Sequence, residues 1–198
     1  MKMTVLTISF AIAALAATSQ NTVRKTSNDA CARTSNKSFS ARLKNYPFNL
    51  AARVLLVSYV GLEPVKPGDS AYVNKGLPRE NDSICYSKLK EIKTLTLPQV
   101  DRLTDILYNY GYAERRQAGR VYIGTINLCY DPHNAILFIS PEGKPLGYIE
   151  LCFFCSRHEE SDGIKLGVMC DQKMNMIKGF FSKAGVTYGV ASEPGAEN

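Results

Sequence analysis

The pattern of apolar and polar positions predicts a sheet built around one strongly apolar strand. The stretch RVLLVSYV at 53–60 is almost uninterrupted in β-branched, apolar and aromatic residues. Such a run is typical of a strand buried on both faces, so we expect it near the centre of a sheet. A second candidate strand, KEIKTLTL, follows at 90–97. The segment between them, 61–82, gathers prolines, glycines and charged residues, and it is predicted to be a long surface loop.

The clearest helix is predicted for TLPQVDRLTDILYNYG at 96–111. Thr96 and Gln99 have the spacing of a capping box, and Gly111 is the expected left-handed stop. Apolar residues recur at helical spacing along one side, which predicts a face turned to the core. That face contains Val100, Leu103, Ile106, Leu107 and Tyr110.

A second helix is predicted for DQKMNMIKGFFSKAG at 171–185. Asp171 is the expected N-cap, and Gly185 is the expected stop. Its inward face is expected to contain Met174, Ile177, Phe180, Phe181 and Ala184.

Strands cluster between the two helices without regular alternation. Three runs, at 121–130, 134–140 and 145–153, predict an antiparallel meander, and Gly143 fits the left-handed position of a hairpin turn with a bulge. A further edge strand is predicted at 164–170. The expected fold class is therefore α+β: a mainly antiparallel sheet, with a C-terminal three-stranded meander and two helices packed on one face.

The two ends of the chain have different expected roles. Residues 1–19 have a basic start, an apolar stretch too short to span a bilayer, and small residues before a cleavage point, as in a signal peptide. Residues 20–41 are polar and are expected to form a flexible leader. We expect a single α+β domain at 42–188 and a disordered tail at 189–198. The predicted location is exported, either periplasmic or extracellular.

The net charge of +6 does not indicate a nucleic-acid-binding protein. The basic residues are dispersed apart from RRQAGR at 115–120, and there is no basic stripe interleaved with aromatic residues. No transmembrane segment is expected in the mature chain. A partner, if there is one, is expected to be another envelope protein.

Six cysteines in an exported chain indicate disulfides. They are Cys31, Cys85, Cys129, Cys152, Cys155 and Cys170. If Cys129 and Cys152 end two strands of the meander at the same edge, they are close enough to pair. Cys155 is then expected to bond Cys170, and Cys31 to bond Cys85.

The main alternative for the cysteines is a metal site. Cys129, Cys152, Cys155 and Cys170 can supply four thiolates to zinc, although a zinc ribbon would have a second close pair. Redox catalysis is disfavoured, because the C-x-x-C pair follows a strand and precedes acidic residues rather than opening a helix. Covalent haem attachment is excluded, because Ser156 follows the second cysteine where a histidine is needed.

Three other residues are candidates for chemistry. His133 and His158 each lie close in sequence to a cysteine, as zinc ligands or as partners of a nucleophilic thiol, but a surface turn is their commonest setting. Glu150 interrupts the apolar strand YIELCF, and strand alternation places it on the solvated face beside Cys152. The sequence identifies no second carboxylate or pocket with which Glu150 would act as a general acid.

The segments CYDPHNAILF at 129–138 and YIELCFFC at 148–155 match the pattern C-Y-x-P-x-N-A-I-x-F followed by Y-I-E-x-C-F-x-C. With Cys170 opening a helix downstream, the chain resembles a family of uncharacterised exported bacterial proteins over about residues 85–185. The resemblance implies a common fold and a shared cysteine cluster. It implies no activity.

The function expected from the sequence is that of an exported, non-catalytic binding or interaction domain with structural cysteines and no cofactor. The alternative is a zinc-binding protein, including a metal-dependent hydrolase, built on the Cys129, Cys152, Cys155 and Cys170 cluster. A thiol oxidoreductase ranks third.

Overall fold

The main element of the fold is a five-stranded antiparallel sheet. The computed structural model describes residues 30–64, 66, 72–74, 76–80, 83–113 and 129–191. The strand order across this sheet is β11-β10-β9-β2-β7, and every neighbouring pair is antiparallel. The strands are β2 (Arg53–Tyr59), β7 (Leu89–Thr94), β9 (Asn134–Ile139), β10 (Pro145–Cys152) and β11 (Arg157–Glu160). The interior position of β2 confirms the prediction made from its uninterrupted apolar run.

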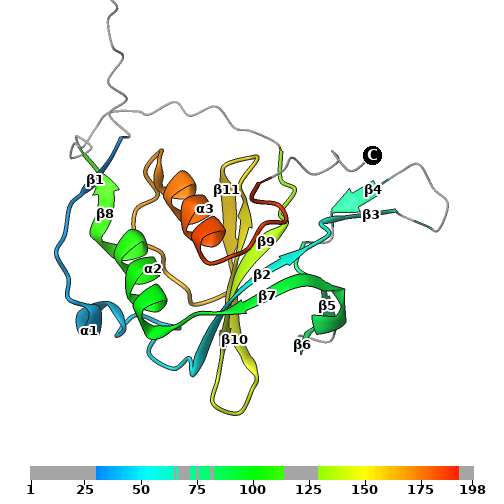
Figure 1. Cartoon of the computed structure of the whole chain (residues 1–198), viewed down its shortest axis with the longest axis horizontal. Coiled ribbons are helices and arrows are strands. Elements are labelled where there is room, and N and C mark those ends of the chain that lie inside the picture. The colour runs from blue at the N-terminus through cyan, green and yellow to red at the C-terminus, as the bar shows by residue number, and fades with distance from the viewer. Residues whose placement is uncertain are drawn as a thin grey trace, which may run out of the picture.

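Both long helices, α2 (Leu97–Asn109) and α3 (Lys173–Lys183), lie side by side over one face of this sheet (Figure 1). Their apolar faces pack on the sheet residues whose side chains point to that side, including Leu56, Ile136 and Leu151. This arrangement confirms the predicted α+β class. No helix in the described part of the chain has the length and apolar character needed to cross a membrane.

The opposite face of the sheet is covered by short hairpins rather than by helices. Leu55, Val57, Leu137 and Ile139 form a second core there with Leu77 and Ile84. Leu77 and Ile84 belong to the segment with the strands β5 (Arg79–Glu80) and β6 (Ser83–Ile84), which the 3₁₀-helix η1 (Tyr86–Lys88) follows. The strands β3 (Leu62–Pro64) and β4 (Tyr72–Asn74) form a separate hairpin that precedes this segment. The predicted surface loop at 61–82 therefore contains the β3–β4 hairpin and strand β5. Buried Leu77 fixes it to the sheet.

Helix α2 begins as predicted and ends differently. Gln99 Oε1 accepts hydrogen bonds from the Thr96 backbone amide and hydroxyl, at 2.8 and 3.1 Å. The helix ends where Tyr110 takes an extended conformation and leads into strand β8 (Tyr110–Tyr112). Gly111 is thus a strand residue and not a left-handed stop. The backbone passes so close to Thr34 there that a Cβ on Gly111 would lie 2.9 Å from the Thr34 hydroxyl.

Helix α3 ends as predicted but begins differently. Gly185 has φ +85° and ends the helix as predicted. The N-cap is Gln172 and not Asp171, and the Gln172 side chain makes no capping bond because its Oε1 accepts a bond from the Cys31 amide at 2.6 Å. The start of α3 is therefore fixed by a strand from the other end of the chain.

The hairpin of β9 and β10 confirms two of the predicted meander strands. Gly143 has φ +81°, and the register shifts between Pro145 and Gly147, as a turn with a bulge requires. The third strand is β11, because a tight turn at 153–156 folds the chain back onto β10. Most of the predicted strand at 121–130 lies outside the described residues, and 129–130 are not in a strand.

The predicted edge strand at 164–170 is wrong. This segment has no regular secondary structure, and β11 occupies the edge of the sheet. Gly167 packs so tightly against the end of α2 that a Cβ would collide with the Leu107 carbonyl. The segment therefore crosses the helix layer instead of pairing with the sheet.

The prediction of a flexible leader is wrong for the part that the structure describes. Strand β1 (Cys31–Arg33) pairs with β8, and helix α1 (Phe39–Arg42) packs against α2. Arg33 binds both carboxylate oxygens of Asp105, at 2.9 and 2.7 Å. This polar segment is held on the fold because its ion pairs and a disulfide take the place of buried apolar contacts. Residues 1–29, including the predicted signal peptide, lie outside the described residues.

The predicted disordered tail also needs correction at its start. Residues 188–191 form a turn, and Val190 is buried. The carboxylate of Glu91 accepts hydrogen bonds from the Thr187 and Tyr188 amides, which holds this turn against strand β7. Residues 192–198 lie outside the described part.

Candidate functional site

The C-x-x-C pair lies in the turn that joins β10 to β11. Cys152 is the last residue of β10, and it pairs across the sheet with Arg157 at the start of β11. Ser156 has φ +52°, a left-handed conformation that allows the chain to reverse within four residues. The turn brings Cys152 and Cys155 to the same side, so the sulfur atoms of Cys129, Cys152 and Cys155 lie within 4.8 Å of one another.

All three predicted disulfide pairings are wrong. Cys129 bonds Cys155 with an S–S distance of 1.98 Å, and Cys31 bonds Cys170 with an S–S distance of 1.95 Å. Cys85 and Cys152 are free thiols. The sequence could not indicate these pairs, because they depend on the turn at 153–156 and on strand β1 reaching the start of α3.

The two disulfides are consistent with an oxidising environment. Cys31 and Cys170 connect the two ends of the described chain, over a sequence separation of 139 residues. Cys85 follows β6, and burial is the main cause that raises the pKa of its thiol, with a hydrogen bond to Glu80 adding to the effect. A raised pKa makes Cys85 a poor nucleophile.

The cluster of Cys129, Cys152 and Cys155 can hold a metal only after the Cys129–Cys155 disulfide is reduced. Three thiolates would then face a common point, as in a tetrahedral zinc site with one open position. Cys170 is not part of this group, because its sulfur is bonded to Cys31. The predicted metal site of four cysteines therefore contains at most three, Cys129, Cys152 and Cys155.

Glu150 is buried and not on a solvated face as predicted. Its side chain is on the sheet face opposite the helices, and the segment around Leu77 covers it, leaving Glu150 7% exposed. One carboxylate oxygen accepts hydrogen bonds from the Leu77 amide and, at 3.1 Å, from the Tyr59 hydroxyl. Burial raises the pKa of Glu150 and raises that of Tyr59 well above its usual value. These contacts make Glu150 an anchor for the covering segment.

The ring of His133 is fully engaged in structural contacts. Its Nδ1 lies 3.2 Å from the Tyr59 carbonyl oxygen and 3.3 Å from the Gly61 amide nitrogen, and its Nε2 lies 3.1 Å from Asp131 Oδ2. His133 therefore connects the end of β2 to the start of β9. With Cys129 in a disulfide, the cysteine–histidine pair considered from the sequence is not formed.

His158 lies on the wrong face of the sheet to join the cysteines. It pairs with Leu151, whose side chain belongs to the helix-side core, whereas Cys152 points to the opposite face. Its Nε2 lies 3.4 Å from a Glu160 oxygen. Neither histidine that the sequence singled out is brought to the cysteine cluster.

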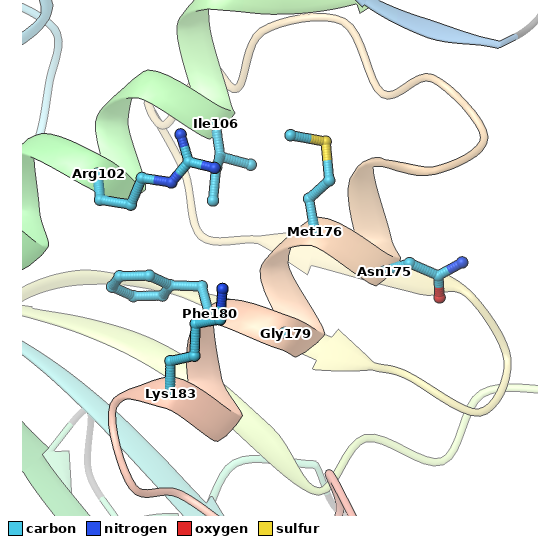
Figure 2. Close-up of a pocket in the computed structure, with 7 residues that line it drawn as sticks. All are labelled: Arg102, Ile106, Asn175, Met176, Gly179, Phe180 and Lys183. Atoms are coloured by element: carbon cyan, nitrogen blue, oxygen red, sulfur yellow. The ribbon is translucent and has the colours of Figure 1, made fainter.

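A groove between α2 and α3 is a separate candidate binding surface. It has a volume of about 210 Å³ and is lined by Arg102, Ile106, Asn175, Met176, Gly179, Phe180 and Lys183. Figure 2 shows Arg102 and Ile106 reaching from α2 toward α3, while Met176 and Phe180 rise from α3 toward them. The floor of the groove is apolar, and Arg102 and Lys183 make part of its rim cationic.

The sequence missed this groove because its residues belong to two helices whose relative position was unknown. Helical spacing showed only which side of each helix faces the core. Sequence reasoning also missed Lys173, which is fully buried and donates from Nζ to the Leu107 carbonyl oxygen at 2.9 Å. Burial lowers the pKa of Lys173 to about 8. A lysine in the first turn of a predicted helix gives no signal of such burial.

Comparison of the chain with protein-family models, with characterised proteins and with solved structures found no match. The arguments about function therefore rest on the geometry of the chain itself.

Proposed function

We propose that this protein is an exported, non-catalytic binding domain whose binding surface is the groove between α2 and α3. The observation that carries the proposal is the combination of an apolar floor with cationic residues at the rim. Lys183 has no ion-pair partner among the described residues, and Arg102 is exposed with Asp105 as its partner. Asp105 is also bound by Arg33, so positive charge remains in excess at the groove.

The size of the groove favours part of a larger partner over an enclosed small molecule. Pockets for drug-sized ligands have volumes of roughly 300–1,000 Å³, and this groove has about 210 Å³. One or two apolar side chains would fill it, and neighbouring carboxylates would pair with Arg102 and Lys183. We therefore propose an acidic peptide segment of another envelope protein as the ligand.

The test is a titration of the isotope-labelled protein with two capped peptides, acetyl-Leu-Glu-Leu-Glu-amide and its glutamine counterpart. We expect the glutamate peptide to shift the amide resonances of α2 and α3, with a Kd on the order of 1 mM. The Arg102→Glu/Lys183→Glu variant should bind at least tenfold more weakly. Lys178→Glu, on the same helix outside the groove, is the matched control.

A second variant separates occupation of the groove from its charge. A Cβ built on Gly179 meets no atom within 4 Å, so Gly179→Leu would project its side chain into open space at the groove and leave both cations in place. We expect this variant to fold and to lose peptide binding. Equal binding of the two peptides, or resonance shifts confined to another surface, would contradict the proposal.

A zinc site at Cys129, Cys152 and Cys155 is the second candidate function, supported by the closeness of the three sulfur atoms. It requires the reduced chain. Titration with cobalt(II) after reduction by a phosphine should then give sulfur-to-metal absorption at one metal per chain, lost in Cys152→Ser. If the reduced protein binds no metal at micromolar concentration, this alternative is rejected.

A further inference from the structure

The cysteine cluster contains a free thiol next to a disulfide. Cys152 is 1% exposed and unbonded, and its sulfur lies within 4.8 Å of both sulfurs of the Cys129–Cys155 disulfide. Thiol–disulfide exchange requires a thiolate within reach of a disulfide sulfur and proceeds by direct attack. This arrangement differs from a structural disulfide in an apolar core, which has no neighbouring nucleophile.

The turn also supplies a hydrogen-bond donor to the Cys152 sulfur. The Cys155 backbone amide donates a hydrogen bond to the Cys152 sulfur at 3.2 Å. This contact fixes the Cys152 sulfur against the backbone of Cys155, one of the two disulfide residues. The C-x-x-C spacing therefore provides the nucleophile, its amide donor and one of the two disulfide sulfurs.

Solvent exposure and charge decide which sulfur is attacked. Attack on Cys129 would leave a thiolate at Cys155, which is 5% exposed, and burying that charge is costly. Attack on Cys155 would instead release Cys129, which is only partly buried. The guanidinium of Arg157 donates to the Cys129 carbonyl oxygen at 3.4 Å, so a cation lies at the backbone of the residue whose sulfur departs. Cationic surroundings stabilise a thiolate.

The pairing of β10 with β11 decides which charged residues share the face of Cys152. The acidic residues after the C-x-x-C motif were expected to oppose thiolate formation. Glu160 pairs with His158 on the helix side of the sheet, whereas Glu159 lies opposite Glu150, so both of these carboxyl groups are on the face of Cys152. Arg157 is the charged residue directly opposite Cys152.

We propose that Cys129, Cys152 and Cys155 form an internal thiol–disulfide exchange site that moves the free thiol between a buried and a partly exposed position. The Cys152 thiolate attacks the Cys155 sulfur. The Cys152–Cys155 bond forms as the Cys129–Cys155 bond breaks, and the electron pair of the broken bond leaves on Cys129. The proton released by Cys152 is balanced by protonation of Cys129 from solvent. No oxidant or reductant is consumed, because one thiol and one disulfide are present before and after the step.

The consequence is a site that can present a reactive thiol without losing its internal crosslink. In one state the thiol is enclosed at Cys152, and in the other it is partly exposed at Cys129. A disulfide of a partner would meet the Cys129 thiol in the second state. This activity does not depend on the groove between α2 and α3.

The test is alkylation of the folded, unreduced full-length chain with iodoacetamide in the presence of EDTA, in a Cys85→Ser background. Acid quenching and peptide mass spectrometry then locate the label and the disulfides. We expect the label on Cys129, together with a Cys152–Cys155 disulfide. In the Cys85→Ser/Cys152→Ser variant, labelling of Cys129 should fall at least tenfold, because the Cys129–Cys155 bond can no longer exchange.

A second variant tests the product state directly. In Cys85→Ser/Cys129→Ser, Cys152 and Cys155 should form a disulfide and resist alkylation until a reductant is added. Detection of the Cys31–Cys170 disulfide in every variant verifies that the chain has folded. Label on Cys152 beside an intact Cys129–Cys155 bond would overturn the proposal, and so would a lasting absence of label.

Discussion

Glu150 shows how the surroundings of one side chain decide its chemistry. The carboxyl group lies under the segment around Leu77 and accepts hydrogen bonds from the Leu77 amide and the Tyr59 hydroxyl. Burial is the largest influence on its pKa, and it acts against the charged form, so the pKa is raised despite these two donors. The folded protein therefore holds this proton more tightly than the unfolded chain does.

This raised pKa predicts a specific dependence of stability on pH. The contribution of Glu150 is fully present below its ordinary pKa of 4.5 and is lost as pH rises through the raised folded value. Glu150→Gln keeps an oxygen for both donors and carries no charge. We expect equal stability of variant and parent at pH 4.5, and a gain on the order of 1 kcal/mol for the variant at pH 8.

Urea unfolding at pH 4.5, 6 and 8 measures this difference. Glu142→Gln is the control, because hydrogen bonds in an exposed turn lower the pKa of Glu142, so replacing it should not change the pH dependence above pH 5. A Glu150→Gln variant that is less stable than the parent at pH 8 would show that the charged carboxylate stabilises the fold.

At the level of elements, one carboxylate connects β1, α1 and α2. Asp105 on α2 binds Arg33 from β1, and its Oδ1 lies 3.4 Å from Nη1 of Arg42, at the end of α1. Burial by itself would raise the pKa of Asp105. Hydrogen bonds from Arg33 and Asn109 and the charge of Arg42 outweigh it and lower the pKa. These ion pairs replace the apolar contacts that the polar segment cannot make.

Asp105→Asn should detach this segment from α2. We expect a loss of roughly 1–3 kcal/mol in the free energy of unfolding at pH 7, because buried Arg42 loses one of its two carboxylate partners. The stabilising contribution of Asp105 is present above its ordinary pKa of 3.8 and is lost as pH falls through the lowered folded value. The loss caused by the substitution should therefore shrink in strong acid.

Chemical denaturation at pH 7 and pH 3, with hydrogen exchange of the β1 amides, tests this prediction. Asp162→Asn, an exposed position with no ion-pair partner among the described residues, should leave both measurements unchanged. Undiminished protection of β1 in Asp105→Asn would show that the disulfide alone holds the segment.

For the whole molecule, the two disulfides differ chiefly in the length of chain they enclose. Cys31–Cys170 has a sequence separation of 139 residues, and Cys129–Cys155 has one of 26. A crosslink restricts the unfolded chain more strongly when it closes a longer loop. Cys31–Cys170 also fixes β1 to the start of α3, so it joins the two ends of the described fold.

Removing Cys31–Cys170 should therefore destabilise the protein more than removing Cys129–Cys155. The loop-entropy relation gives a difference of roughly 1.5 kcal/mol between the double alanine variants Cys31→Ala/Cys170→Ala and Cys129→Ala/Cys155→Ala. Unfolding by guanidinium chloride without reductant measures it. The reverse order would mean that native-state contacts around Cys129, and not chain entropy, dominate the crosslink energy.

Local patterns were sufficient for the principal elements of the fold. The uninterrupted apolar run identified β2 as an interior strand, and the Thr96–Gln99 pair located the start of α2. Gly143 and Gly185 marked a hairpin turn and a helix end, since a left-handed backbone favours glycine. These signals depend on neighbouring residues, so the sequence by itself determined the α+β class and the helix-covered sheet.

The tertiary structure alone decided the sites. The partners of Cys31 and Cys129, the burial of Glu150 and the groove beside Arg102 and Lys183 all depend on contacts between segments far apart in the chain. Pairing rules fix which residues share a face, but a single tight turn at 153–156 decided which sulfur atoms meet. A thiol, a carboxylate or a lysine acquires its chemistry from burial and from its partners. Neither is encoded in the spacing of residues along the chain.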